Sequence, residues 1–486
     1  MKYAAIIFLI LPFHIAAQDY VLQYDTLHAA QNAALSDIPA LYGLRQPCSK
    51  SALSVSFVRT DFDKAPVAEL GKGTGVASFD AGTYMHLGKA TVTGFASYDN
   101  GKIFDMQGSE TSDAALLYPY LTADEHGGDL SHERYAFGGS YSSAIDSHWL
   151  YGAELSYQAV QDYRRRDPRP KNTTGTLVAK VSGGYRLSRY DIGIAVGASK
   201  YKQTNSIIFM SELGEDKIYH TTGLGTHYNR FAGQGKTSAY NGTGVDVSLG
   251  LTPRVGGGFA NVAYRHFSFR KQLTDLNNLP LAKADDNAVG LEAGWQTDAW
   301  VLKGVFSHLR RDGYENIFGD PSGQVYPQIA SVKGYSRKNM YAGASALWRS
   351  IAGRRRIDLV ASLGYATTVE RYRDLRGIDL KSLSARLGGE YVVMAKHVAV
   401  HVAADASLRE VLSSKSYGLG GDDFLSRFAG SDFLYASGRH IDLSLRPGLD
   451  YLLRGGRTAG LRLGAAYHKR GSASGMTFES SLIFSF

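Results

Sequence analysis

From residue 52 to its carboxyl end, the sequence alternates between strand-like segments and two kinds of connection. One kind has two or three residues, as in Gly88-Lys89, Ser188-Arg189 and Ala395-Lys396. The other kind is longer and polar, and it covers residues 61–73, 99–134, 161–174, 204–240, 272–286, 311–336, 372–378, 412–437 and 470–475. A membrane barrel has this asymmetry, because its periplasmic turns are tight and its extracellular loops are long. The pattern predicts an all-β, antiparallel transmembrane β-barrel over residues 51–486, with about 18 strands and with about 16 or 20 as alternatives.

Individual segments alternate apolar and polar side chains, as expected for strands between lipid and a wet lumen. Ile441, Leu443 and Leu445 share one face of a segment, and Asp442 and Arg446 share the other. A basic side chain on the lipid face costs about 2–4 kcal/mol at the membrane midplane. The charged faces are therefore predicted to line the lumen, with Arg386, Glu390, Asp405, Arg409, Asp442, Arg446, Arg462 and Glu479 as candidates.

This lumen set has four acidic and four basic residues. Three interpretations follow: cross-strand ion pairs that stiffen a wet wall, a polar solute pathway, or a discrete binding site. The sequence does not choose between them.

The last twelve residues, GMTFESSLIFSF, form an alternating strand that ends on an aromatic residue. This ending resembles the assembly signal of Gram-negative outer-membrane barrels, here carried by Phe478, Leu482, Phe484 and Phe486. The segment Asn32-Ala33-Ala34-Leu35 resembles the Asn-x-Ala-x-Leu segment before the first strand of many Bacteroidota barrels. The chain thus resembles Bacteroidota outer-membrane barrels of an uncharacterised family, a domain of unknown function. The resemblance implies contact with outer-membrane lipid, lipopolysaccharide and the barrel assembly machinery, and it implies no substrate.

The amino-terminal residues 1–17 read MKYAAIIFLILPFHIAA, with Lys2 before an apolar core and small residues before Gln18. They are predicted to be a cleaved secretory signal peptide, so the expected location is the outer membrane of a Gram-negative cell. Residues 18–50 show helix-like spacing and are predicted to form a periplasmic segment, either a short helix or a plug. No amino-terminal plug domain of the TonB-dependent receptors, with their roughly 22 strands, is expected.

Five basic residues gather in the segment predicted as the third outer loop: Arg164, Arg165, Arg166, Arg169 and Lys171. They are interpreted either as a solvated loop or as a contact with lipopolysaccharide phosphates or an anionic solute. The formal net charge is +8, but an exported barrel with scattered basic residues is not expected to bind nucleic acid.

No cofactor or metal site is predicted. His397 and His401 share a strand face, but four residues of strand separate them by about 13 Å, too far for one metal ion. No catalytic motif such as G-x-S-x-G occurs, and an enzyme is not expected. The leading hypothesis is a channel or facilitator for a small polar or amphipathic solute. The alternative is a closed structural or interaction barrel that acts through its outer loops or a periplasmic partner, and a barrel hydrolase is the third hypothesis.

Overall fold

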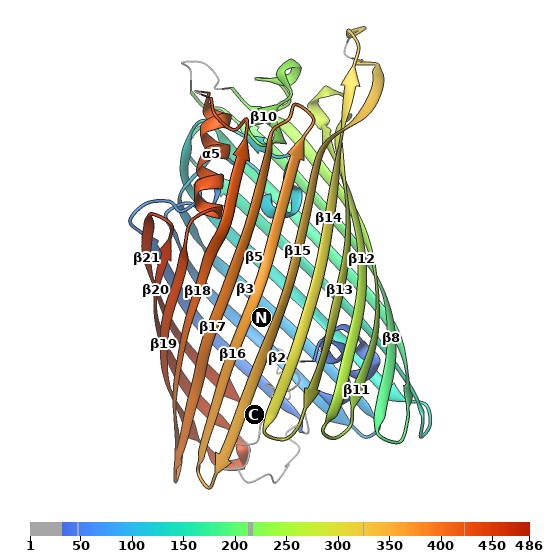
Figure 1. The fold of residues 1–486 in the computed structure, drawn as a ribbon, viewed down its shortest axis with the longest axis vertical. Coiled ribbons are helices and arrows are strands. Elements are labelled where there is room, and N and C mark those ends of the chain that lie inside the picture. Colours follow the sequence, from blue (N-terminus) through green and yellow to red (C-terminus); the bar gives the residue numbers. More distant parts are fainter. Residues whose placement is uncertain (1–31, 46–47, 212–216, 324, 422) are drawn as a thin grey trace, which may run out of the picture.

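A computed structural model describes residues 32–45, 48–211, 217–323, 325–421 and 423–486. The signal peptide predicted for residues 1–17 lies outside these ranges. The described chain folds into one closed antiparallel sheet of 18 strands (Figure 1). Among the described residues, no helix is long and apolar enough to cross a membrane.

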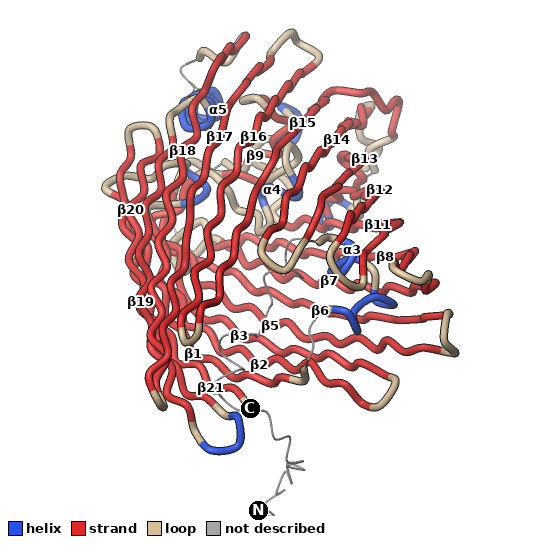
Figure 2. Tube along the Cα trace, turned by 60° about the horizontal axis from the view of Figure 1, so that its bottom comes forward, coloured by secondary structure: helices blue, strands red, loops and turns tan. Residues whose placement is uncertain are grey.

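Every strand of the barrel pairs with its neighbours in chain order, and β1 pairs with β21 to close the sheet (Figure 2). The strands are β1 (Lys50–Phe62), β2 (Gly73–Leu87), β3 (Ala90–Gln107), β5 (Gly127–Ala144), β6 (Trp149–Arg164), β7 (Arg169–Arg186), β8 (Tyr190–Ile208), β11 (Thr237–Pro253), β12 (Gly257–Leu273), β13 (Leu279–Gln296), β14 (Trp300–Phe318), β15 (Gln328–Ala352), β16 (Arg355–Tyr372), β17 (Gly377–Ala395), β18 (Val398–Tyr417), β19 (His440–Leu452), β20 (Thr458–Arg470) and β21 (Ala473–Ser485). Closure leaves no sheet edge with unpaired backbone groups in hydrocarbon. The predicted fold class and strand count are confirmed.

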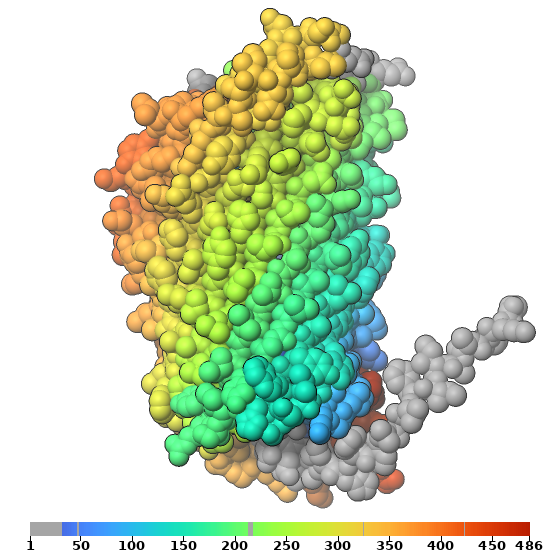
Figure 3. All heavy atoms as spheres, turned by 90° about the vertical axis from the view of Figure 1, so that its right-hand side faces the viewer, coloured from blue at the N-terminus to red at the C-terminus, as the bar shows by residue number. Residues whose placement is uncertain are grey.

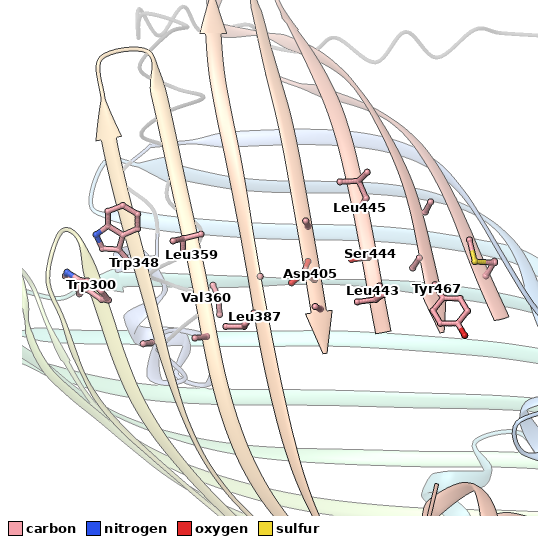
Figure 4. A pocket seen from close by; sticks show the side chains of 18 residues that line it. Trp300, Trp348, Leu359, Val360, Leu387, Asp405, Leu443, Ser444, Leu445 and Tyr467 are labelled. Atoms are coloured by element: carbon pink, nitrogen blue, oxygen red, sulfur yellow. The ribbon is translucent and has the colours of Figure 1, made fainter. Parts of the chain in front are cut away.

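The two faces of each strand differ as the alternation predicts. In β19, Leu443 and Leu445 are 49% and 52% exposed, as side chains that meet lipid must be. The outer face of β14 to β21 carries a shallow apolar groove of about 930 Å³ (Figure 4). The space-filling view shows the wall as a continuous surface over the strands between β7 and β16 (Figure 3).

Each predicted short connection falls at a turn between consecutive strands. We name this end of the barrel periplasmic, as in known barrels. Several predicted long loops are much shorter, and those boundaries were wrong. The segment 161–174 belongs mostly to β6 and β7, and only residues 165–168 form the turn. The reason is that these strands continue beyond the apolar part of the wall. There both faces of a strand can be polar, so a polar segment is not necessarily a loop.

Three long connections fold back into the extracellular half of the lumen, and we call them the outer plug (residues 108–126, 217–236 and 423–439). The first contains α4 (Ala114–Leu117) and β4 (Thr122–Ala123), the second β9 (Tyr219–Gly223), β10 (Thr226–His227) and η3 (Asn229–Phe231), and the third α5 (Phe424–Ala436). Strands β10, β9 and β4 form a small sheet of their own. Leu117, Tyr120 and Leu121 pack against Tyr201 and Phe269 of the wall.

Residues 34–44 form the inner plug, at the periplasmic end. It consists of α3 (Ala34–Asp37) and η1 (Pro39–Leu44), whose apolar side chains pack against Leu150 and Ala195 of the wall. The amide of Ala40 donates to Ser182 Oγ at 2.7 Å. A Cβ atom on Gly152 would lie 2.5 Å from the Ala40 nitrogen, so this close contact requires glycine in β6. Part of the predicted segment 18–50 therefore lies inside the barrel. Three further short helices are η2 (Ala68–Leu70), η4 (Thr274–Leu276) and η5 (Arg454–Gly456).

Candidate functional site in the lumen

The inner wall over β15 to β20 carries a continuous set of ion pairs near the periplasmic end. Asp450 accepts from Arg462 Nη1 at 2.7 Å, and its other oxygen lies 2.7 Å from His401 Nε2. His401 Nδ1 lies 3.3 Å from Glu390, which also accepts from Arg356 at 2.7 Å. We call this set the periplasmic charge row; its members are Arg349, Arg356, Asp358, Glu390, His401, Asp450 and Arg462. In the described part of the chain, no group of His, Cys, Asp and Glu is arranged to hold a metal ion.

A second set lies nearer the middle of the wall, where Asp405 binds two arginines. Arg386 Nη2 lies 2.6 Å from Asp405 Oδ1, and Arg446 Nη2 lies 2.5 Å from Asp405 Oδ2. Glu479 and Arg446 both flank Gly464, where an added Cβ would lie 3.2 Å from Glu479 Cβ and 3.4 Å from Arg446 Cγ. We call these four residues the middle charge row. The side chains of Arg386 and Arg446 are 55% and 47% exposed, so this part of the lumen is accessible to solvent.

Two of the sequence-predicted candidates lie higher on the wall, toward the outer plug. Asp442 accepts from Arg470 and from Ser407 Oγ, and it lies 2.7 Å from His468 Nδ1. Arg409 has a different role from a wall ion pair, because its Nη2 donates to the carbonyl oxygen of Ala436 at 2.9 Å. It thus holds the carboxyl end of α5.

The outer plug is attached to the wall by a buried ionic triad. Arg164 Nη2 lies 2.5 Å from both Glu110 and Asp124, and the three side chains are 4%, 0% and 0% exposed. Burial, helped by the adjacent Asp124 carboxylate, raises the pKa of Glu110 well above its ordinary range. Breaking such a pair leaves an uncompensated buried charge, which typically costs about 3–5 kcal/mol.

The structure corrects the interpretation of one of the five basic residues, Arg164. Arg164 points into the barrel, so it cannot meet lipopolysaccharide or an anionic solute at the surface. Arg169 pairs with Asp167 at 2.5 Å, and the guanidinium of Arg165 lies 5.9 Å from the Tyr163 ring centre. Arg165 and Arg166 lie in the turn, and Arg169 and Lys171 share one face of β7, so the prediction of a basic outer surface stays open for these four residues.

Two further contacts of the outer plug with the wall were not predicted from the sequence. Lys271, which is fully buried, donates from Nζ to the carbonyl oxygen of Leu121 at 2.6 Å. Arg311 donates to the carbonyl oxygen of Tyr118 at 2.6 Å and forms a two-point pair with Asp286. The acceptors are loop carbonyls more than a hundred residues away, and backbone atoms leave no signature in a sequence.

Solved structures that are similar to the chain include two receptors and one outer-membrane transporter. The ferric preacinetobactin receptor BauA from Acinetobacter baumannii has 9% identity and a TM-score of 0.45, with 90% of this chain and 80% of that chain covered. The transporter YddB from Escherichia coli has 9% identity and a TM-score of 0.41 over 90% of this chain and 81% of that one. The siderophore receptor PirA from Pseudomonas aeruginosa has 8% identity and a TM-score of 0.37 over 90% and 80%.

No curated protein matches the chain. A family model does match it, over residues 39–486, which include the whole barrel and η1 of the inner plug. The chain belongs to the Family of unknown function (DUF6850).

Proposed function

We propose that the protein is a plugged channel of the Gram-negative outer membrane, which passes a small polar solute when the outer plug moves. One observation carries the proposal. Between the two plugs, Arg386 and Arg446 remain about half exposed although both bind Asp405. Barrels of about 16–18 strands are wide enough to leave an aqueous channel, and these half-exposed side chains line such a space.

The wall favours a polar solute without strong charge selection. Acids and bases alternate along both charge rows, so a passing solute meets ion pairs and not one sign of charge. The outer plug can move without breaking covalent bonds, because ion pairs, hydrogen bonds and side-chain packing hold it to the wall.

Conductance of the purified protein in planar bilayers tests the proposal. The variant Arg164→Met leaves Glu110 and Asp124 buried without their cation, and we expect it to open the channel more often than the natural protein. Arg165→Met removes the same charge one residue away, in the turn after β6, and should behave like the natural protein. The channel would be refuted if the natural protein, Arg164→Met and a variant lacking residues 110–124 all folded correctly and none gave a measurable conductance.

The same experiment supports the closed interaction barrel if all three proteins are silent. The observation in favour of that second function is the apolar packing of the outer plug on the wall, in which Tyr120 and Tyr240 are fully buried. Such packing is suited to a permanent closure as well as to a movable one.

A further inference from the structure

A polar cavity of about 510 Å³ lies at the periplasmic end, between the inner plug and the wall. Ala40, Gly43 and Leu44 of η1 form one side of it. The other side comes from β2, β3, β5, β6 and β7 and from the turns between them. Its volume is in the range of about 300–1,000 Å³ that is usual for small-molecule sites.

The basic side chains that line this cavity are Lys89 and Arg186, and the imidazole of His86 lies beside them. The one acidic residue is Asp146, whose Oδ1 already accepts the amides of His148 and Trp149 at 2.7 and 2.8 Å. These hydrogen bonds hold the carboxylate in the turn, where it keeps its negative charge. Lys89 and Arg186 together therefore leave a surplus of one positive charge in the lining.

Arg186 has donor capacity left. Its side chain is 29% exposed, and its ion pair with Asp191 spans 3.9 Å from Nε, which is beyond hydrogen-bond distance. Asp191 is also 3.3 Å from Arg254, which shares its charge. Lys89, at the tip of the β2–β3 turn, forms no ion pair with any described residue. Two basic side chains are thus available to a ligand.

Hydroxyl groups complete the lining, from Thr91, Ser142, Ser143 and Ser147. Ser142 and Ser143 donate their hydroxyl protons to the carbonyl oxygens of Thr91 and Lys89, so toward a ligand they are acceptors that suit a sugar-like hydroxyl. A mixture of basic and hydroxyl side chains suits a ligand that carries both kinds of group.

We infer that this cavity binds a small hydroxylated anion, of the class of sugar acids and sugar phosphates, through Lys89 and Arg186. The ligand contacts η1 and the wall together, so it stabilises the inner plug in its place. This site goes beyond the proposed channel, because binding here does not require the outer plug to open.

Isothermal titration of the full-length, detergent-solubilised barrel tests the inference. Glucuronate is the probe, with glucose as its uncharged counterpart and inorganic phosphate as an anion without sugar hydroxyls. We expect glucuronate to bind, glucose not to bind, and phosphate to bind more weakly than glucuronate.

The variants Lys89→Gln and Arg186→Gln should each weaken glucuronate binding by about tenfold or more, because each removes a hydrogen bond to a charged group. Lys396→Gln is the matched control, since Lys396 is exposed in another periplasmic turn, between β17 and β18. Lys89 is exposed as well, so Lys89→Gln should fold even if Arg186→Gln does not.

Absence of glucuronate binding, or equal weakening by Lys396→Gln, would overturn the site. Phosphate binding as tight as glucuronate would overturn the hydroxylated class of ligand. Neither result depends on conductance, so failure of this site and failure of the channel are separate outcomes.

Discussion

The contact between η2 and α5 should weaken as the pH rises toward neutrality. Glu69 of η2 shares a hydrogen bond with Asp432 of α5, in the extracellular half of the protein. Burial raises the pKa of Glu69 from its ordinary 4.5 to about 7. Burial, with the nearby Glu69 and Glu370, also raises the pKa of Asp432 well above its ordinary range. Because two carboxyl groups share one site, they titrate as a pair.

The sign follows from proton binding. The docked state has the higher pKa values, so it binds more protons than a state in which α5 has left. The contact therefore has its full strength below a pH of 4.5 and loses it as the pH rises to about 7. Each tenfold change in proton affinity is worth about 1.4 kcal/mol, so the rise from 4.5 to about 7 gives about 3 kcal/mol for one proton held by the pair. This corresponds to a change in the docking equilibrium of roughly a hundredfold.

Hydrogen exchange of the α5 amides measures this change. In the natural protein, the protection factors of α5 should fall by up to about a hundredfold between a pH of about 5 and a pH of about 8. The double variant Glu69→Gln/Asp432→Asn should keep its protection at both values. Glu133→Gln, which removes a carboxylate from β5, should behave like the natural protein. Equal pH dependence in the natural protein and in the double variant would refute the reasoning.

Three further predictions concern the wall. Leu445→Arg should lower the free energy of unfolding by up to about 2–4 kcal/mol, seen as a lower urea midpoint. Ser444→Arg, on the lumen side, should leave the midpoint unchanged. Phe486→Ala should reduce the heat-modifiable, membrane-inserted fraction in cells, and an unchanged fraction would exclude a role for the terminal aromatic residue in assembly. Lys271→Met should leave the urea midpoint unchanged or raise it, because it replaces a buried amine by an apolar side chain of similar volume while the Leu121 carbonyl oxygen keeps the amide of Thr221 as a donor at 2.9 Å.

The sequence predicted the barrel wall because lipid imposes a local rule. Each residue of β19 must face either hydrocarbon or the lumen, so the polarity of Leu443 and Asp442 is enough to assign their faces, even when their partners are unknown. The turns were equally local, as Gly88-Lys89 shows.

The plugs could not be predicted in this way. Arg164 was assigned to the surface because its neighbours in sequence are basic, whereas its acidic partners lie 54 and 40 residues earlier in another connection. The same holds for the middle charge row, where parity placed Asp405 and Arg446 on one face but could not show that the lumen around them is wet.

The pairing of β1 with β21 also fixes how long β1 must wait for its partner strand to be synthesised. Thr60 and Thr477, which share a hydroxyl hydrogen bond of 2.8 Å across this junction, are 417 residues apart in sequence. At a synthesis rate of about 5–20 residues per second, roughly 20 to 80 seconds pass between the appearance of one partner and of the other. Throughout that interval β1 has an exposed edge that can pair with any other strand. Protection of this edge until the last phenylalanine arrives is therefore a task for the cell, and a chain interrupted before β21 never completes it.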